Sequence, residues 1–199
     1  MTYIDELILK KREEMKKEKF ATLEEGMYLD GRMTYFERKD LLDALSIMLP
    51  DSWKQMPEEY ARIKYPSEFR PKIIITTADL SVNLGFTVFP GQIQVDDAAK
   101  TVERMRAAIH RSNPDYLMYP CNKLQDIQGS WFAFRSHAMD SDLYNMMMIA
   151  SVGKKTVQGS FNCLYNEYAK WKKMVLLIWN SILELREEAW LNARSKISC

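Results

Sequence analysis

The sequence predicts an α+β domain built on an antiparallel β-sheet of about six strands, flanked by helices and preceded by a helical arm. Three observations lead to this fold class. Segments rich in β-branched and aromatic residues follow one another across turns too short for parallel crossovers. Two other segments repeat apolar residues every three or four positions, as helices do. The first 25 residues are mostly charged. We therefore expect an arm over residues 1–25 and one domain over residues 26–199.

The arm is expected to be helical over residues 2–25, with a thin apolar stripe of Ile4, Leu7, Ile8 and Met15. A helix of this kind buries little apolar surface by itself, so tertiary contacts or a partner must hold it. Two interpretations remain: a solvated helix packed along one edge, and a docking arm.

The strands begin with a hairpin, because β-forming residues flank Asp30-Gly31, a dipeptide typical of hairpin turns. A turn with a short helix is expected over residues 51–65, and Gly153-Lys154-Lys155 is expected to turn between two late strands. Further strands are predicted over residues 44–49, 73–77, 82–89, 116–119, 129–137, 143–152 and 156–163.

Two more helices are predicted. The first crosses the sheet from about Val95 to Asn113-Pro114 and presents one apolar face. The second runs over about residues 166–193 and is part of the domain over residues 26–199. Because Trp179 and Leu183 lie off its main apolar seam, this helix is apolar nearly all round and must be buried on every side. The N-terminal helix or a second subunit would cover it.

Composition excludes several classes of protein. Lys and Arg number 28 and Asp and Glu 27, so the net charge of +1 gives no basic footprint for nucleic acid. The longest apolar stretch, Met174–Trp179, is far shorter than the roughly 20 residues of a membrane span. The chain opens without a signal-peptide pattern, and three widely spaced cysteines, Cys121, Cys163 and Cys199, suit reduced thiols. We therefore expect a cytoplasmic protein.

Motifs for catalysis and cofactor binding are scarce. The sequence contains no Gly-x-Gly-x-x-Gly, Walker A, Gly-x-Ser-x-Gly or His-Glu-x-x-His pattern, and only two histidines, His110 and His137. His137 lies near Asp140 and Asp142, but their spacing matches no established metal-ligand motif. We expect no metal, no cofactor and no enzyme activity. The alternative is a thiol-dependent hydrolase in which Cys163 and His137 meet in space.

The candidate partner surface is an apolar excess in the strand over residues 143–152. Successive strand residues point to opposite faces, so Met147 faces away from its two neighbouring methionines. If helices cover only one face of the sheet, Met147 lies on an open face; the alternative is a sheet covered on both faces. The candidate partner-binding residues are Tyr144, Met146, Met147, Met148 and Trp179.

The segment Ile47-Met48-Leu49-Pro50-Asp51-Ser52-Trp53 and the order of elements around it resemble the PsbP-like fold family, which includes DcrB-like proteins and a Ran-binding relative. The resemblance spans about residues 27–186. It implies an antiparallel sheet flanked by helices, no shared catalytic motif, and protein partners. It also implies a specific role, because some DcrB-like members act as cytoplasmic chaperones that hold apolar effector helices before secretion.

The function expected from the sequence is thus a non-enzymatic cytoplasmic protein-binding module, such as a secretion-associated chaperone or adaptor, whose partner is unknown. Two alternatives remain beside it: the hydrolase using Cys163 and His137, and a homo-oligomeric structural protein, for instance a homodimer, that buries the last helix between subunits.

Overall fold

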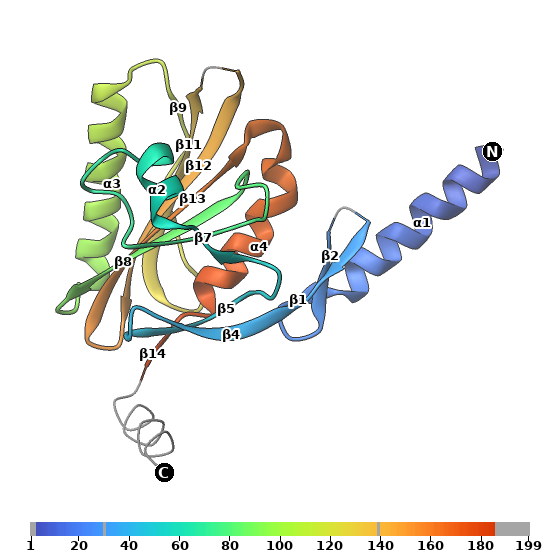
Figure 1. Cartoon of the computed structure of the whole chain (residues 1–199), viewed down its shortest axis with the longest axis horizontal. Coiled ribbons are helices and arrows are strands. Elements are labelled where there is room, and N and C mark those ends of the chain that lie inside the picture. The colour runs from blue at the N-terminus through green and yellow to red at the C-terminus, as the bar shows by residue number, and fades with distance from the viewer. Residues whose placement is uncertain (1–2, 30, 139, 186–199) are drawn as a thin grey trace, which may run out of the picture.

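The computed structural model describes residues 3–29, 31–138 and 140–185 (Figure 1). Its elements, in chain order, are α1 (Tyr3–Lys19), β1 (Ala21–Thr22), β2 (Gly26–Leu29), β3 (Arg32–Thr34), β4 (Phe36–Leu41), β5 (Leu45–Pro50), β6 (Lys54–Gln55), α2 (Glu58–Lys64), β7 (Ile73–Thr76), β8 (Asn83–Pro90), α3 (Val95–Ser112), β9 (Leu117–Met118), β10 (Asn122–Lys123), β11 (Gln128–His137), β12 (Asp142–Val152), β13 (Lys155–Leu164), a 3-10 turn (Tyr165–Glu167), α4 (Tyr168–Asn180) and β14 (Leu183–Glu184). The predicted α+β class with antiparallel sheets and an N-terminal helix is confirmed.

The main sheet has eight strands in the order β10-β11-β12-β13-β8-β7-β6, with β9 paired to β11, and every pair is antiparallel. It exceeds the expected six strands because β6 and β10 are two-residue segments that carry no sequence pattern of their own, whereas β9 falls within the strand predicted over residues 116–119. The longest strands are β11, β12 and β13, and the alternation of buried and half-buried side chains is clearest along β13. The turn between β12 and β13 lies at Gly153, whose φ of +58° suits glycine.

Two three-stranded sheets flank the main one. The first, β1-β2-β3, contains the predicted hairpin, with Gly31 at a φ of +77°. The second, β14-β5-β4, contains a strand that the sequence does not predict, because β4 is the charged segment Phe36–Leu41. Backbone pairing with β5 over its whole length holds this segment as a strand.

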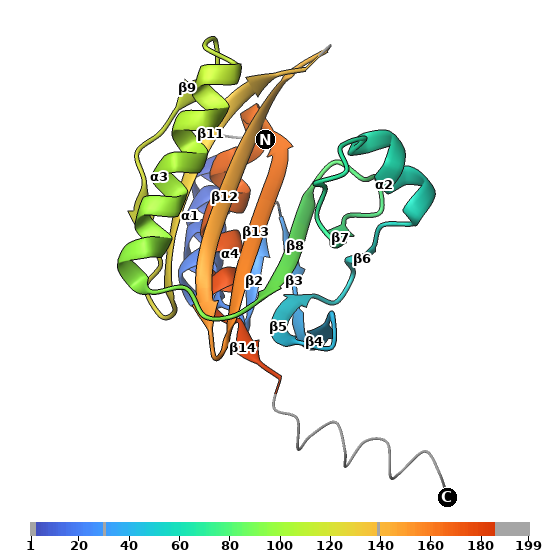
Figure 2. The same ribbon diagram turned by 90° about the vertical axis from the view of Figure 1, so that its left-hand side faces the viewer.

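Helices cover both faces of the main sheet (Figure 2). On one face, Met174, Val175, Ile178 and Trp179 of α4 pack onto the sheet within the large core cluster. On the other face, α3 packs over β11 and β12 in a smaller cluster that includes Phe132. The alternative of a sheet covered on both faces therefore holds over β11 and β12.

The two terminal helices are shorter than predicted. The first ends at Lys19 instead of residue 25, because the chain from Ala21 pairs as β1 with β2. The last ends at Asn180 instead of residue 193. The side-chain amide of Asn180 donates a hydrogen bond to the Leu176 carbonyl, and the Ser181 hydroxyl donates one to the Ile178 carbonyl. These side chains thus satisfy backbone carbonyls at the end of the helix. The chain then pairs with β5 as β14, and residues 186–193 lie outside the described residues.

Within the described residues, no helix has both the length and the apolar character that a membrane crossing requires.

Candidate functional site

Four of the five predicted partner-binding residues are core residues. Tyr144, Met146, Met148 and Trp179 are at most 2% exposed. The even-numbered residues of β12 point toward α4, and Trp179 on α4 points back toward them, so these side chains cover one another. The prediction of a partner surface at these four positions is wrong for the chain as described. Because the sheet already buries the inner side of α4, a second subunit is not needed to cover Trp179.

Met147 has a different environment, because it points to the opposite face. It is half-buried against the α3 cluster and lines a groove of about 360 Å³ between that cluster and the segment over residues 65–71. The floor includes the polar side chains of Gln158 and Ser160, and Phe69 on the wall is 94% exposed. The prediction that Met147 points to the opposite face of the sheet from Met146 and Met148 is confirmed. The face on which Met147 lies is partly open at this groove.

The structure does not bring Cys163 and His137 together. Cys163 lies on β13, paired with Tyr144, whereas His137 lies on β11, paired with Asp142, so β12 separates them. Two strand spacings amount to about 10 Å, well beyond hydrogen-bond reach. The Cys163 thiol is buried and donates to the Leu164 carbonyl at 3.3 Å. Burial raises its pKa to about 12, which disfavours the thiolate that a nucleophile requires.

His137 instead belongs to an ion-paired cluster at the end of the β11–β12 hairpin. Its Nδ1 lies 2.6 Å from Asp142 Oδ1, while Arg135 donates from Nε and Nη2 to Asp142 Oδ2. The Arg135 guanidinium also lies 4.8 Å from the centre of the Tyr165 ring. Asp142 is therefore engaged by two cationic or hydrogen-bonding side chains. Among the described residues, no group of three His, Cys, Asp or Glu side chains is arranged to hold a metal.

These contacts predict how Asp142 titrates. The hydrogen bond to His137, and then those from Arg135, hold the pKa of Asp142 below its usual value. The contacts of ionised Asp142 therefore stabilise the folded state fully above the ordinary aspartate pKa of about 4. This stabilisation is lost as the pH falls through the lower pKa of Asp142 in the folded state. We expect His137→Phe to raise the pKa of Asp142 toward its usual value, as measured by NMR titration of the carboxyl carbon.

Asp79 is the control for this titration, because hydrogen bonds from Thr77 and Ser81, and not from His137, lower its pKa. Its titration should not change. If Asp142 titrates as before in the His137→Phe protein, Arg135 alone sets its pKa and the pairing with His137 is without effect.

A second and more extensive surface lies along the outer side of α4. A groove of about 660 Å³ separates α4 from the edge of the main sheet at β10 and β11, with Leu124, Trp131, Leu176 and Leu177 as apolar lining. A second groove of about 360 Å³ lies between α4, β2 and the end of α1. Ala169 and Lys173 line both, so the two grooves lie next to each other along the helix. We call them together the α4 groove.

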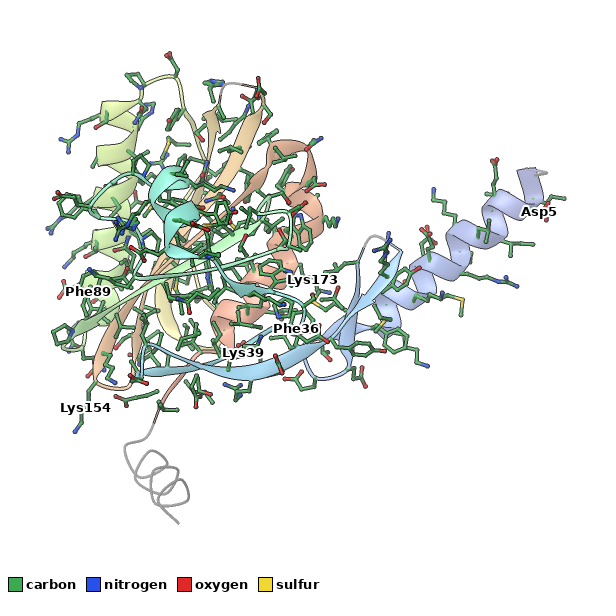
Figure 3. The ribbon with its side chains drawn as sticks, in the orientation of Figure 1. Asp5, Phe36, Lys39, Phe89, Lys154 and Lys173 are labelled. Atoms are coloured by element: carbon green, nitrogen blue, oxygen red, sulfur yellow. The ribbon has the colours of Figure 1, made fainter. Side chains whose placement is uncertain are left out.

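Lysines surround the α4 groove. Among the described residues, no aspartate or glutamate lines it, and five lysines do: Lys17, Lys123, Lys170, Lys172 and Lys173. Lys173 lies on the side of α4 that faces the β1-β2-β3 sheet (Figure 3). The Lys172 ammonium lies 5.4 Å from the centre of the Trp131 ring, so cation and apolar floor meet directly. Sequence patterns do not single out these lysines, although three of them fall within one turn of an otherwise apolar helix.

No protein-family model and no curated protein sequence matches this chain. Its structure is similar to the solution structure of cyanobacterial PsbP (CyanoP) from Synechocystis sp. PCC 6803, with a TM-score of 0.56 and 10% sequence identity; the match covers 80% of this chain and 98% of that one. It is also similar to LpqN, involved in cell envelope biogenesis of Mycobacterium tuberculosis, with a TM-score of 0.49 and 12% identity, over 84% of this chain and 99% of that one.

The likeness to CyanoP shows that the chain has a PsbP-like fold, as the resemblance in the sequence implies. The finer resemblance to DcrB-like and Ran-binding proteins stays a prediction.

Proposed function

We propose that this protein is a non-enzymatic binding module whose α4 groove holds an acidic, amphipathic helix of a protein partner. The observation that carries the proposal is an apolar floor that, in the part of the chain the structure describes, is lined by five lysines and no carboxylate.

The apolar lining supports a helical occupant. Amphipathic helices bind by laying their apolar face into a hydrophobic groove. Leu176 and Leu177 are the part of α4 that the sheet leaves half-exposed, and Trp131 and Leu124 continue the apolar surface onto the sheet edge. Ala169 has a small side chain at the point where the two halves of the groove join, which leaves room for a second helix to approach.

The charges support an acidic occupant. The whole chain carries a net charge of only +1, so five lysines without an acid among the lining residues are a local concentration of charge. None of the salt bridges within the described residues involves Lys17, Lys123, Lys172 or Lys173. Their ammonium groups remain available for carboxylates of a partner, and such complementarity favours encounter and specificity.

The cytoplasmic location and the role of secretion-associated chaperone or adaptor are parts of this proposal. The free thiols of Cys121 and Cys163 are compatible with a reducing compartment. An apolar groove that accepts a helix is compatible with a protein that holds apolar helices of a client.

The test measures binding of a synthetic helical peptide with glutamates on one face and leucines on the other, by fluorescence anisotropy with the full chain. We expect saturable binding that weakens as salt is added. Reversing Lys123, Lys172 and Lys173 to glutamate should weaken it by roughly 10- to 100-fold, because each exposed ion pair contributes about 0.5–1 kcal/mol.

The matched control reverses three exposed cations elsewhere, in Lys54→Glu/Lys72→Glu/Arg104→Glu, and so makes the same change in net charge. This variant should bind nearly as well as the natural sequence. The proposal fails if the peptide does not bind saturably, or if both triple variants lose affinity equally.

A further inference from the structure

We infer that α1 pairs with α1 of a second copy of this chain, with the two helices antiparallel. The inference concerns a surface apart from the apolar floor of the α4 groove and does not depend on the proposed function.

α1 has few contacts with its own chain. Every side chain over residues 4–19 is exposed, and the helix extends away from the body with Asp5 near its N-terminal end (Figures 1 and 3). Its link to the body is at its C-terminal end, where Lys16 lies 5.1 Å from the centre of the Tyr28 ring. A helix of 17 residues, about 25 Å long, is only marginally stable alone in water. Packing against another element would hold it.

The apolar residues of α1 form one stripe. Ile4, Leu7, Ile8 and Met15 are spaced to share a face, and they are 45–66% exposed. Lys11 falls within the same stripe and pairs with Glu14 at 3.5 Å, so its apolar stem lies along the seam while its charge reaches the edge. Leu9 lies on the opposite side of the helix and is not part of the stripe.

The charges of α1 select a second copy and its direction. Asp5 and Glu6 occupy the first turn, and Lys16, Lys17 and Lys19 the last. In an antiparallel pair with Leu7 opposite Met15, the acidic turn of each helix lies beside the basic turn of the other. Twofold symmetry makes this contact twice. Lys11 then lies opposite its own copy at the twofold axis, where each lysine is paired with Glu14 of its own helix. A parallel pair would bring like charges together at both ends. The same order of charges also interacts favourably with the dipole of an isolated α1. That interaction does not bury the apolar stripe, whereas a second helix does.

The experiment measures the mass of the full chain by sedimentation velocity over a wide concentration series. We expect a monomer–dimer equilibrium. Leu7→Glu/Ile8→Glu should raise the dimer dissociation constant by about tenfold or more, because it places charges in the seam. Leu9→Glu, which adds a charge to the opposite side of the same helix, should leave the equilibrium nearly unchanged.

A charge exchange tests the direction and separates loss of pairing from loss of helix. Asp5→Lys/Glu6→Lys should weaken the dimer, and adding Lys16→Glu/Lys17→Glu should restore it, although that exchange opposes the helix dipole. A chain that is monomeric at every concentration overturns the inference. So does a dimer that is insensitive to the stripe variant, or one that the four-residue exchange fails to restore.

Discussion

Replacing Trp179 by alanine is expected to lower the free energy of unfolding by about 3–5 kcal/mol, the usual cost of deleting a buried tryptophan. The indole is fully buried between α4 and the main sheet. It lies over Gly159 of β13, where a Cβ atom would come within 3.2 Å of Nε1. The absence of a side chain at that position lets the ring approach the strand, so its removal leaves a cavity at the centre of the core. Urea unfolding followed by far-ultraviolet circular dichroism measures the loss.

The control for this prediction is Trp179→Phe. The Nε1–H of Trp179 is buried without a hydrogen-bond partner among the described residues, so phenylalanine removes part of the ring but no hydrogen bond. Its loss should be clearly smaller than that of alanine. A Trp179→Ala protein destabilised by less than about 1 kcal/mol would be in the range of surface substitutions and would show that α4 is not seated on the sheet as described.

The core strands and the crossing helix could be predicted because their patterns are local. β13 alternates apolar and polar side chains from Val157 to Cys163, β12 contains a long apolar run, and the turn between them has its own glycine. The helix predicted from about Val95 to Asn113-Pro114 corresponds to α3, since its apolar stripe and its terminating Asn113-Pro114 both lie in the sequence.

Elements that depend on distant contacts could not be predicted. β4 is a charged segment that becomes a strand because β5 lies beside it. α4 ends at Asn180 partly because the side-chain Oδ1 of Asn180 also accepts hydrogen bonds from the backbone N–H groups of Gln125 and Asp126, more than 50 residues away in the sequence. An apolar run that continues past such a contact gives no local indication of where the helix stops.

The candidate site, too, can be predicted from the sequence only in part. Alternation along a strand predicts that Met147 faces away from Met146 and Met148, and it does. Which face the helices leave open depends on tertiary packing, so Tyr144 and Trp179 are core residues and not a surface. The α4 groove unites Lys123 with Lys172, which come from separate elements nearly 50 residues apart, and no sequence window contains both.

Replacing Gly129 by alanine is expected to lower the free energy of unfolding by about 1–3 kcal/mol, the usual cost of overpacking, although the change adds a single methyl group. Gly129 pairs with Ala150 across β11 and β12. A Cβ atom there would come within 2.7 Å of the Ile149 carbonyl oxygen and 2.9 Å of the Ala150 Cα. Backbone atoms cannot turn aside as a flexible side chain does, so the two strands would have to separate.

Ser151→Ala is the matched control, because it changes one atom beside the same strand pair. The Ser151 hydroxyl is buried and has no hydrogen-bond partner among the described residues, so its removal should cost little or be slightly stabilising. Urea unfolding of the two variants separates the effect of crowding at Gly129 from the general sensitivity of this strand pair to substitution.

The Gly129 carbonyl also accepts a hydrogen bond from the Leu124 backbone at 2.9 Å, and Trp131 follows two residues later. Separation of the strands would therefore displace the apolar floor of the α4 groove, so Gly129→Ala should weaken binding of the acidic peptide even where the protein remains folded. Equal stability and equal peptide binding in the two variants would show that the β11–β12 pair is not packed as closely as the structure has it.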